Sequence, residues 1–186
     1  MLQGIIPFAH DLLAKTIEKG DIAVDATCGN GNDTLFLSTL VGPEGHVYGF
    51  DIQQQAIDNT NTLLHEQNRK NVTLIHDSHA NVDTYIKEQT PLAAAVFNLG
   101  YLPRSDKKII TKPNTTLTAV TKLLKLLRNG GLLVLVVYAG HPGGSEEKNA
   151  VLKYTTTLDQ KIYNVLKYQF INLKNEPPFV IAIHKK

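Results

Sequence analysis

The side chains that could do chemistry follow the ends of short apolar runs. After the first run, Gly29 and Gly31 are separated by one residue, a spacing that lets the backbone turn tightly and approach a ligand closely. The dinucleotide-binding pattern needs a third glycine where Thr34 stands, so a pyrophosphate would have a poorer cradle here. This departure favours a ligand with a nucleoside and no pyrophosphate. Asp25, just before the turn, suits a cationic group on that ligand.

Two further apolar runs end in partners for the rest of a nucleoside. Asp51 lies roughly 20 residues after the glycine turn, where a carboxylate can accept hydrogen bonds from ribose hydroxyls. Capping of the next helix would also explain it. Asp77 and Ser78 can hydrogen-bond an adenine edge. His76 and His79 raise the question of a metal, but no cysteine or carboxylate cluster with metal-site spacing accompanies them, so we predict none.

Asn98 gives the clearest indication of the reaction type. Its side-chain carbonyl and the backbone carbonyl that follows can together hold a primary amine with the lone pair directed at an electrophile. Tyr101 can stack on a planar base or surround a positively charged methyl donor. Methyl transfer to an amine mainly requires in-line positioning of the reacting atoms. An asparagine that only caps a turn would explain the same residue without chemistry.

The two segments that follow the fourth and fifth apolar runs are candidates for substrate contact. His141 lies among the glycines of 140–144, in a loop that is either a lid or a plain turn. This histidine is a candidate base, and a surface position would explain it equally well. Basic residues from Arg104 to Lys112 come directly after the Asn98 motif, where they could meet phosphates. A solvated loop would show the same charge.

An alternation of strands and helices must position these residues. Strands are expected over 22–27, 46–50, 72–76, 93–99 and 132–138, and helices over 7–18, 33–40, 53–68, 115–128 and 146–165. The segment 129–131 is expected to end the fourth of these helices. Two closing strands, 168–173 and 179–183, are joined by too few residues for a crossover helix and should pair antiparallel.

This alternation predicts a Rossmann-like α/β fold. The sheet should be mostly parallel and seven-stranded, with an antiparallel C-terminal strand and helices on both faces. In such sheets a ligand binds beyond the carboxyl ends of the strands, which is where the polar residues above stand.

The composition limits the class of protein. A chain of 186 residues, 42% hydrophobic and 19% charged, is typical of one soluble domain, here 1–186. No run approaches the ~20 apolar residues of a membrane helix, and the N-terminus lacks a signal-peptide pattern. The single cysteine, Cys28, favours a reducing cytoplasm. A net charge of +2 is too small to establish nucleic-acid binding.

Five segments resemble class I S-adenosylmethionine methyltransferases and, more narrowly, the bacterial YtqB/MnmM family, long called rRNA methylases. They are 6–10, 25–34, 47–51, 98–103 and 138–144, which extend over nearly the whole chain. The first, fourth and last are more specific than a general methyltransferase pattern. The fourth is only similar to the Asn-Pro-Pro-Tyr motif of many amino methyltransferases, because Leu99 and Gly100 replace its prolines.

The resemblance implies a specific reaction, cofactor and partner. It implies S-adenosylmethionine-dependent methylation of the aminomethyl group of 5-aminomethyl-2-thiouridine, at wobble position 34 of tRNA. The product would be 5-methylaminomethyl-2-thiouridine. Since no separate RNA-binding domain is visible, the catalytic domain, or a homodimer of it, would bind the anticodon arm itself.

The residue pattern and the resemblance together assign the site residues. Those expected around the donor are Asp25, Thr27, Gly29, Asn30, Gly31, Asn32, Asp33, Asp51, Ile52, Gln53, Asp77, Ser78, His79 and Asn98. Those expected toward the acceptor are Tyr101, Pro103, Arg104, Lys107, Lys108, Gly140, His141, Pro142, Gly143 and Gly144. Asn98, Tyr101 and His141 are expected to take part in catalysis.

Three alternatives remain open at the level of sequence. A nicotinamide-dependent oxidoreductase would use the glycine turn and Asp51, and Tyr163 and Lys167 have the Tyr-x-x-x-Lys spacing of short-chain dehydrogenases. A noncatalytic RNA-binding module could keep a methyltransferase fold. A small-molecule N-methyltransferase would explain the missing RNA-binding domain, although not the basic loop.

Overall fold

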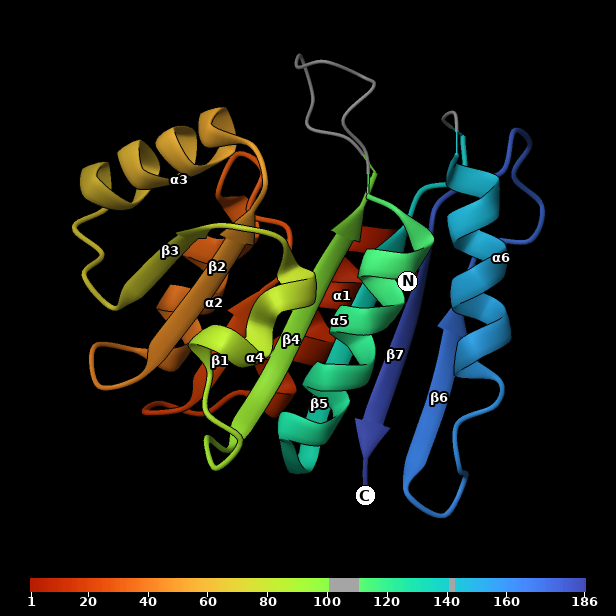
Figure 1. The fold of residues 1–186 in the computed structure, drawn as a ribbon. Helices are drawn as coiled ribbons and strands as arrows, with labels where there is room; N and C mark the ends of the chain where they lie inside the picture. The colour runs from red at the N-terminus through yellow and green to blue at the C-terminus, as the bar shows by residue number, and fades with distance from the viewer. Residues whose placement is uncertain (101–110, 141–142) are drawn as a thin grey trace.

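A seven-stranded sheet in the order β3-β2-β1-β4-β5-β7-β6 forms the centre of the computed structural model, which describes residues 1–100, 111–140 and 143–186 (Figure 1). The strands are β1 (Ile22–Asp25), β2 (His46–Asp51), β3 (Val72–His76), β4 (Leu92–Leu99), β5 (Leu127–Val137), β6 (Tyr163–Tyr168) and β7 (Phe179–Lys185). The first five pair in parallel, and β7 pairs antiparallel with both β5 and β6. The predicted fold class is therefore confirmed.

The central strands are apolar because both of their faces are covered. In β4 every residue from Leu92 to Phe97 is buried, and β5 is buried from Gly131 to its end. β1 lies between β2 and β4, with Asp25 paired to Gly49 on one side and to Val96 on the other. The carboxyl ends of these three strands therefore meet at one edge of the sheet.

Helices cover both faces of the sheet (Figure 1). On one face, α1 (Ile5–Thr16) packs on β4, β5 and β7, and α2 (Asn32–Val41) packs on β1 and β2, with α3 (Gln54–Glu66) beside it. The other face carries α4 (Val82–Tyr85), α5 (Pro113–Leu126) and α6 (Gly144–Thr155), preceded by the 3-10 turn η1 (His79–Asn81). No helix among the described residues has both the length and the apolar character needed to cross a membrane.

Two expected boundaries near the C-terminus are wrong. α6 ends at Thr155 and β6 begins at Tyr163, whereas a helix to 165 and a strand from 168 were expected. The hydroxyls of Thr155, Thr156 and Thr157 donate to carbonyls three or four residues earlier, which competes with continued helix. The turn that follows brings the next strand forward.

The glycines after α5 do not cap it. The helix ends at Leu126, and Gly130, with φ 79°, lies inside β5. The register between β4 and β5 shifts between Leu92 and Ala94, so the glycines form an irregular start to the strand. The short helical segments η1 and α4 were not expected either, because they are too brief to show a helical period.

Candidate active site

The glycine turn after β1 begins α2 and closes against α3. Gly29 has φ 54° and Gly31, the N-cap of α2, has φ 85°, so both adopt the left-handed conformation that glycine tolerates best. The Cys28 N–H donates to the Phe50 carbonyl at 2.9 Å, which ties the turn to the end of β2. A Cβ on Gly31 would lie 3.0 Å from both Cα and Oγ1 of Thr60 on α3. The turn thus needs glycine for its conformation and for close packing.

Asp51, the last residue of β2, holds this turn from the side. Its Oδ2 accepts from the Gly29 N–H at 3.0 Å, and its Oδ1 accepts from the Gln53 N–H at 2.9 Å. A carboxylate has about four lone-pair positions, so roughly two remain for other donors. Because the side chain is only partly buried, these positions suit the two hydroxyls of a ribose. The donor set therefore fits the nucleoside predicted from the sequence.

Asp25 lies inside the protein beneath the turn. It has no exposed surface, and it accepts from the Thr34 hydroxyl at 2.6 Å and from the Thr27 N–H at 3.0 Å. Burial, and next the negative charge of Asp33, raise the pKa of Asp25 to about 7. Thr34, which stands where the dinucleotide pattern has glycine, therefore anchors a buried carboxyl group.

The segment after β3 presents a pre-oriented carboxylate and a hydroxyl. Asp77 accepts from the Asn81 amide at 3.0 Å, from the Ser78 N–H at 2.6 Å and from the Tyr85 hydroxyl at 2.9 Å, and these hydrogen bonds lower its pKa. Ser78 Oγ accepts from the Ala80 N–H at 3.2 Å, which leaves the hydroxyl hydrogen available to donate. Ser78 therefore keeps a hydrogen that could be donated to an adenine edge, whereas three donors of the chain already orient the Asp77 carboxylate.

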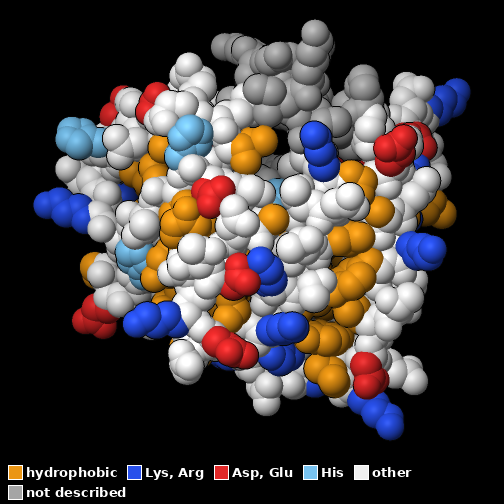
Figure 2. Space-filling view, viewed as in Figure 1, with side chains coloured by type: hydrophobic (Ala, Val, Ile, Leu, Met, Phe, Trp, Pro, Cys, Tyr) orange, Lys and Arg blue, Asp and Glu red, His pale blue; other side chains and the backbone are white. Residues whose placement is uncertain are grey.

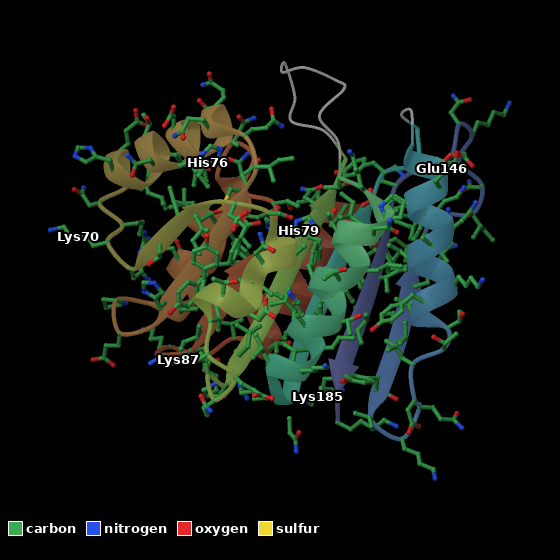
Figure 3. The ribbon with its side chains drawn as sticks, in the orientation of Figure 1. Lys70, His76, His79, Lys87, Glu146 and Lys185 are labelled. Atoms are coloured by element: carbon green, nitrogen blue, oxygen red, sulfur yellow. The ribbon has the colours of Figure 1, made fainter. Side chains whose placement is uncertain are left out.

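The two histidines of this segment have separate partners. His79 is 8% exposed, and its Nδ1 lies 2.9 Å from the Ala26 carbonyl, whereas His76 Nε2 lies 3.0 Å from the Ile52 carbonyl (Figure 3). Burial lowers the pKa of His79 and favours its neutral form. Within 1–100, 111–140 and 143–186, no group of three or more His, Cys, Asp or Glu side chains is arranged to hold a metal ion.

Asn98, at the end of β4, is linked to the glycine turn and to α1. Its N–H donates to Thr27 Oγ1 at 2.7 Å, and its side-chain Nδ2 donates to Asp33 Oδ2 at 3.3 Å. The other Asp33 oxygen lies 2.7 Å from Nε2 of His10, whose ring stacks on Phe36 at a centroid distance of 4.0 Å. Sequence reasoning gave His10 no role. The only signal was its position in the segment 6–10, one of those that carry the family resemblance.

The described ends of the segment 101–110 are joined to each other and to α6. The Thr111 N–H donates to the Gly100 carbonyl at 3.1 Å. The carboxylate of Glu147, 1% exposed, accepts from the hydroxyls of Thr111 at 2.6 Å and Thr116 at 2.7 Å. Glu147, which sequence reasoning missed, thus connects the described residues that follow this segment to the first turn of α6.

Several predicted acceptor-side residues lie outside the described residues, namely Tyr101, Pro103, Arg104, Lys107, Lys108, His141 and Pro142. Among the described ones, Gly140 is exposed at the exit of β5. Gly143, with φ 81°, is the N-cap of α6, and Gly144 begins that helix.

The Tyr-x-x-x-Lys spacing does not form a dehydrogenase site. Tyr163 and Lys167 lie on β6, at the far edge of the sheet from β1 and β2. The Tyr163 hydroxyl donates to the Leu124 carbonyl at 3.4 Å, and Lys167 Nζ lies 4.7 Å from the centre of the Phe179 ring. Both side chains are therefore occupied away from the glycine turn, and the oxidoreductase alternative loses its second motif.

Known proteins similar to this chain include methyltransferases. The family model described as "Putative rRNA methylase" matches residues 47–184. The chloroplastic tRNA (mnm(5)s(2)U34)-methyltransferase of Arabidopsis thaliana is 38% identical over 187 residues, which cover 96% of this chain and 68% of that protein. Two crystal structures each align with this chain over the full length of both proteins. The protein from Clostridium thermocellum, described as a "putative rRNA-methylase", has a TM-score of 0.97 and 45% identity. SMU.1697c from Streptococcus mutans, described as a "putative methyltransferase" in complex with SAH, has a TM-score of 0.92 and 46% identity.

Proposed function

This chain belongs to the family described as "Putative rRNA methylase", and within that family we propose that it methylates the aminomethyl nitrogen of 5-aminomethyl-2-thiouridine at wobble position 34 of tRNA. The methyl donor is S-adenosylmethionine. The observation that carries the proposal is the 38% identity, over 96% of the chain, to a methyltransferase named for that wobble uridine. The product would be 5-methylaminomethyl-2-thiouridine.

The donor side of the site is built from the exits of β1, β2 and β3. S-adenosylmethionine supplies a methyl group bonded to a positively charged sulfur. In the proposal, the free positions on the Asp51 carboxylate accept from the ribose hydroxyls, and Asp77 with Ser78 contacts the adenine edge. The turn at 27–32, together with Ile52, Gln53 and His79, encloses the rest. Asp25 acts beneath the turn, because its carboxyl group has no exposed surface and is bonded to Thr27 and Thr34.

The acceptor side is built on Asn98. Its side-chain carbonyl holds the primary amine, and the amine nitrogen forms a bond to the methyl carbon while the carbon–sulfur bond breaks. The electron pair of that bond stays on sulfur, and the new secondary ammonium group releases one proton to a base, for which His141 is the candidate, or to water. Tyr101 and His141 complete the proposed catalytic set, as a stacking surface and a candidate base.

The proposed partner is the anticodon arm of a tRNA. On the face shown in Figure 2, lysines and arginines are interspersed with acidic side chains, as expected for a net charge of +2. The stretch from Arg104 to Lys112 is a local excess of positive charge in the sequence, and it follows the Asn98 motif directly. Phosphate contacts from this stretch would orient the RNA, while the base itself is read in the pocket.

Nucleoside analysis tests the function directly. Bulk tRNA from a strain that lacks this protein should accumulate 5-aminomethyl-2-thiouridine, and the purified protein with S-adenosylmethionine should convert it to the methylated nucleoside. Ribosomal RNA and a free primary amine serve as competing acceptors in the same assay. Transfer only to ribosomal RNA, or only to the free amine, would replace the proposed substrate. No transfer to any acceptor would favour a binding module.

The variant Asn98→Ala tests the chemistry of the acceptor side. It should lose methyl transfer while S-adenosylhomocysteine, the demethylated donor, binds with nearly unchanged affinity. Near-normal turnover of this variant would remove Asn98 from the proposed catalytic set.

A further inference from the structure

A carboxylate joins α1 to the proposed amine-binding residue. Asp33 lies in the first turn of α2, where the helix dipole favours negative charge. One of its oxygens is 2.7 Å from His10 Nε2 and the other is 3.3 Å from Asn98 Nδ2. The side chains of His10 and Asp33 are 27% and 13% exposed, so this chain of contacts is largely shielded from water.

This arrangement fixes which way the Asn98 amide faces. An ionised carboxylate only accepts hydrogen bonds, so the end of the Asn98 side chain nearest to Asp33 must be its NH2 group. The carbonyl oxygen Oδ1 therefore faces away from Asp33. The backbone of Asn98 is fixed as well, because its N–H donates to Thr27 at 2.7 Å.

His10 in turn fixes Asp33. With a carboxylate as its partner, Nε2 of His10 must carry a hydrogen and donate it. The ring has little freedom to turn away, since it stacks on Phe36 with an interplanar angle of 11°. The side chain of Phe36 comes from the same helix as Asp33, one turn further on. His10, Asp33 and Asn98 thus form one hydrogen-bonded row across α1, α2 and β4.

We infer that His10 and Asp33 are positioning residues for methyl transfer: Asp33 receives the amide hydrogen of Asn98 and His10 holds Asp33 in place, so that Asn98 Oδ1 is presented to the acceptor amine. This inference rests on the proposed function. It also moves Asp33 from the donor-binding residues assigned from the sequence to the acceptor side of the site.

Kinetics of four variants test this role. At saturating donor and hypomodified tRNA, His10→Ala and Asp33→Ala should each slow single-turnover transfer about 10- to 100-fold, the size expected when a positioned reactant loses its alignment. His10→Gln keeps an N–H that can reach Asp33, so it should retain a rate within about threefold of wild type. The double variant His10→Ala/Asp33→Ala should be no slower than Asp33→Ala alone, because His10 acts through Asp33.

Donor binding separates this role from the earlier assignment of Asp33. The dissociation constant of S-adenosylhomocysteine should change less than about twofold in all four variants. A loss of donor affinity in Asp33→Ala that matches its loss of rate would return Asp33 to the donor side and overturn the inference. Wild-type rates in both alanine variants, or a His10→Gln variant as slow as His10→Ala, would also overturn it.

An NMR measurement needs no substrate and so distinguishes failure of this inference from failure of the proposed function. The side-chain amide signals of Asn98, identified by their loss in Asn98→Ala, should move in both His10→Ala and Asp33→Ala. They should not move in the matched control His46→Ala. His46 lies at the amino-terminal end of β2, where its ring nitrogen contacts Thr73 at 2.8 Å, whereas Asn98 lies near the carboxyl end of β4. Unmoved signals would refute the positioning role even if tRNA is methylated. Moved signals without any methylation would leave the positioning role standing and refute the acceptor.

Discussion

Asp25 makes the stability of this protein depend on pH in an unusual direction. Its pKa is about 7 in the folded protein, against 3.8 for an ordinary aspartate, so the folded state holds a proton that the unfolded chain has released. The free energy of unfolding therefore contains a contribution that is full below about pH 4 and is lost as the pH rises toward about 7. Above that pH the loss is complete.

Replacing Asp25 with asparagine should remove this dependence. As the pH rises from about 5 to 7.5, the free energy of unfolding of the wild type, measured with urea, should fall relative to that of Asp25→Asn by up to about 1.4 kcal/mol per pH unit. The comparison isolates Asp25, because the opposite contribution of His79, whose pKa is lowered by burial, is common to both proteins. Parallel stability curves for the two proteins would show that the buried carboxyl group is ionised throughout.

Asp51 should govern donor affinity at the same scale. Asp51→Asn keeps the shape of the side chain, but its NH2 group cannot accept from Gly29, Gln53 or a ribose hydroxyl. We expect the dissociation constant of S-adenosylhomocysteine to rise about 10- to 100-fold, as for the loss of one or two hydrogen bonds to a charged group, measured by calorimetry. Asp58→Asn, which changes an exposed aspartate on α3, is the matched control. Equal affinities in the two variants would exclude Asp51 as a ribose partner.

At the scale of elements, the start of α2 depends on its contact with α3. Gly31→Ala combines a strained φ of 85° with a Cβ only 3.0 Å from the Thr60 backbone. Gly20→Ala provides the control, because Gly20 has a similar φ of 89° with nothing within 4 Å of the added Cβ. Gly20→Ala should cost about 1–2 kcal/mol of unfolding free energy. Gly31→Ala should cost clearly more and weaken donor binding as well, since Thr60 or the turn must shift. Similar losses in the two variants would show that α2 and α3 separate easily.

The elements themselves were largely predictable, because continuous apolar runs such as β4 are clear in the sequence. The fold class, the family and the methyltransferase class are confirmed. The end of α6 was not predictable from period alone, since the threonine hydroxyls at 155–157 compete for backbone carbonyls. The start of β5 was also missed, because its glycines resemble a helix end.

The polar side chains of the site were harder to assign than the strands. The glycine turn, Asp51 and Asn98 were found because each lies at or shortly after the carboxyl end of a strand. The contact between His10 and Asp33 spans 23 residues and arises only when α1 packs beside α2. Glu147 lies 31 residues from Thr116 and was missed for the same reason. For Asp25 the sequence pointed to a ligand, whereas its partners in the structure are Thr27 and Thr34. The roles of the site residues in binding and catalysis remain predictions.

At the scale of the whole molecule, RNA binding should depend on the positive charge of the stretch from Arg104 to Lys112. Charge reversal at Lys107 and Lys108 should weaken tRNA binding without changing donor affinity. The slope of log affinity against log salt concentration should fall by about one to two, as expected for the loss of one to two phosphate contacts. The charge-matched control is Lys125→Glu with Lys161→Glu. Lys125 lies in the last turn of α5 and Lys161 just before β6, both near the amino-terminal ends of strands. Filter binding at several salt concentrations measures both effects. An unchanged affinity after the first pair of substitutions would mean that RNA contacts the protein elsewhere.

The hydrogen bond between Gly100 and Thr111, buttressed by Glu147, has a consequence for evolution and engineering. It ties the end of β4 directly to the residues that precede α5, so the placement of these two elements does not depend on the length of the segment between them. The entropy of closing such a loop grows only slowly with its length, by about 0.6 kcal/mol for each doubling. One scaffold could therefore accept exchangeable inserts at this position, and a relative could acquire a new acceptor there while its donor site stays untouched.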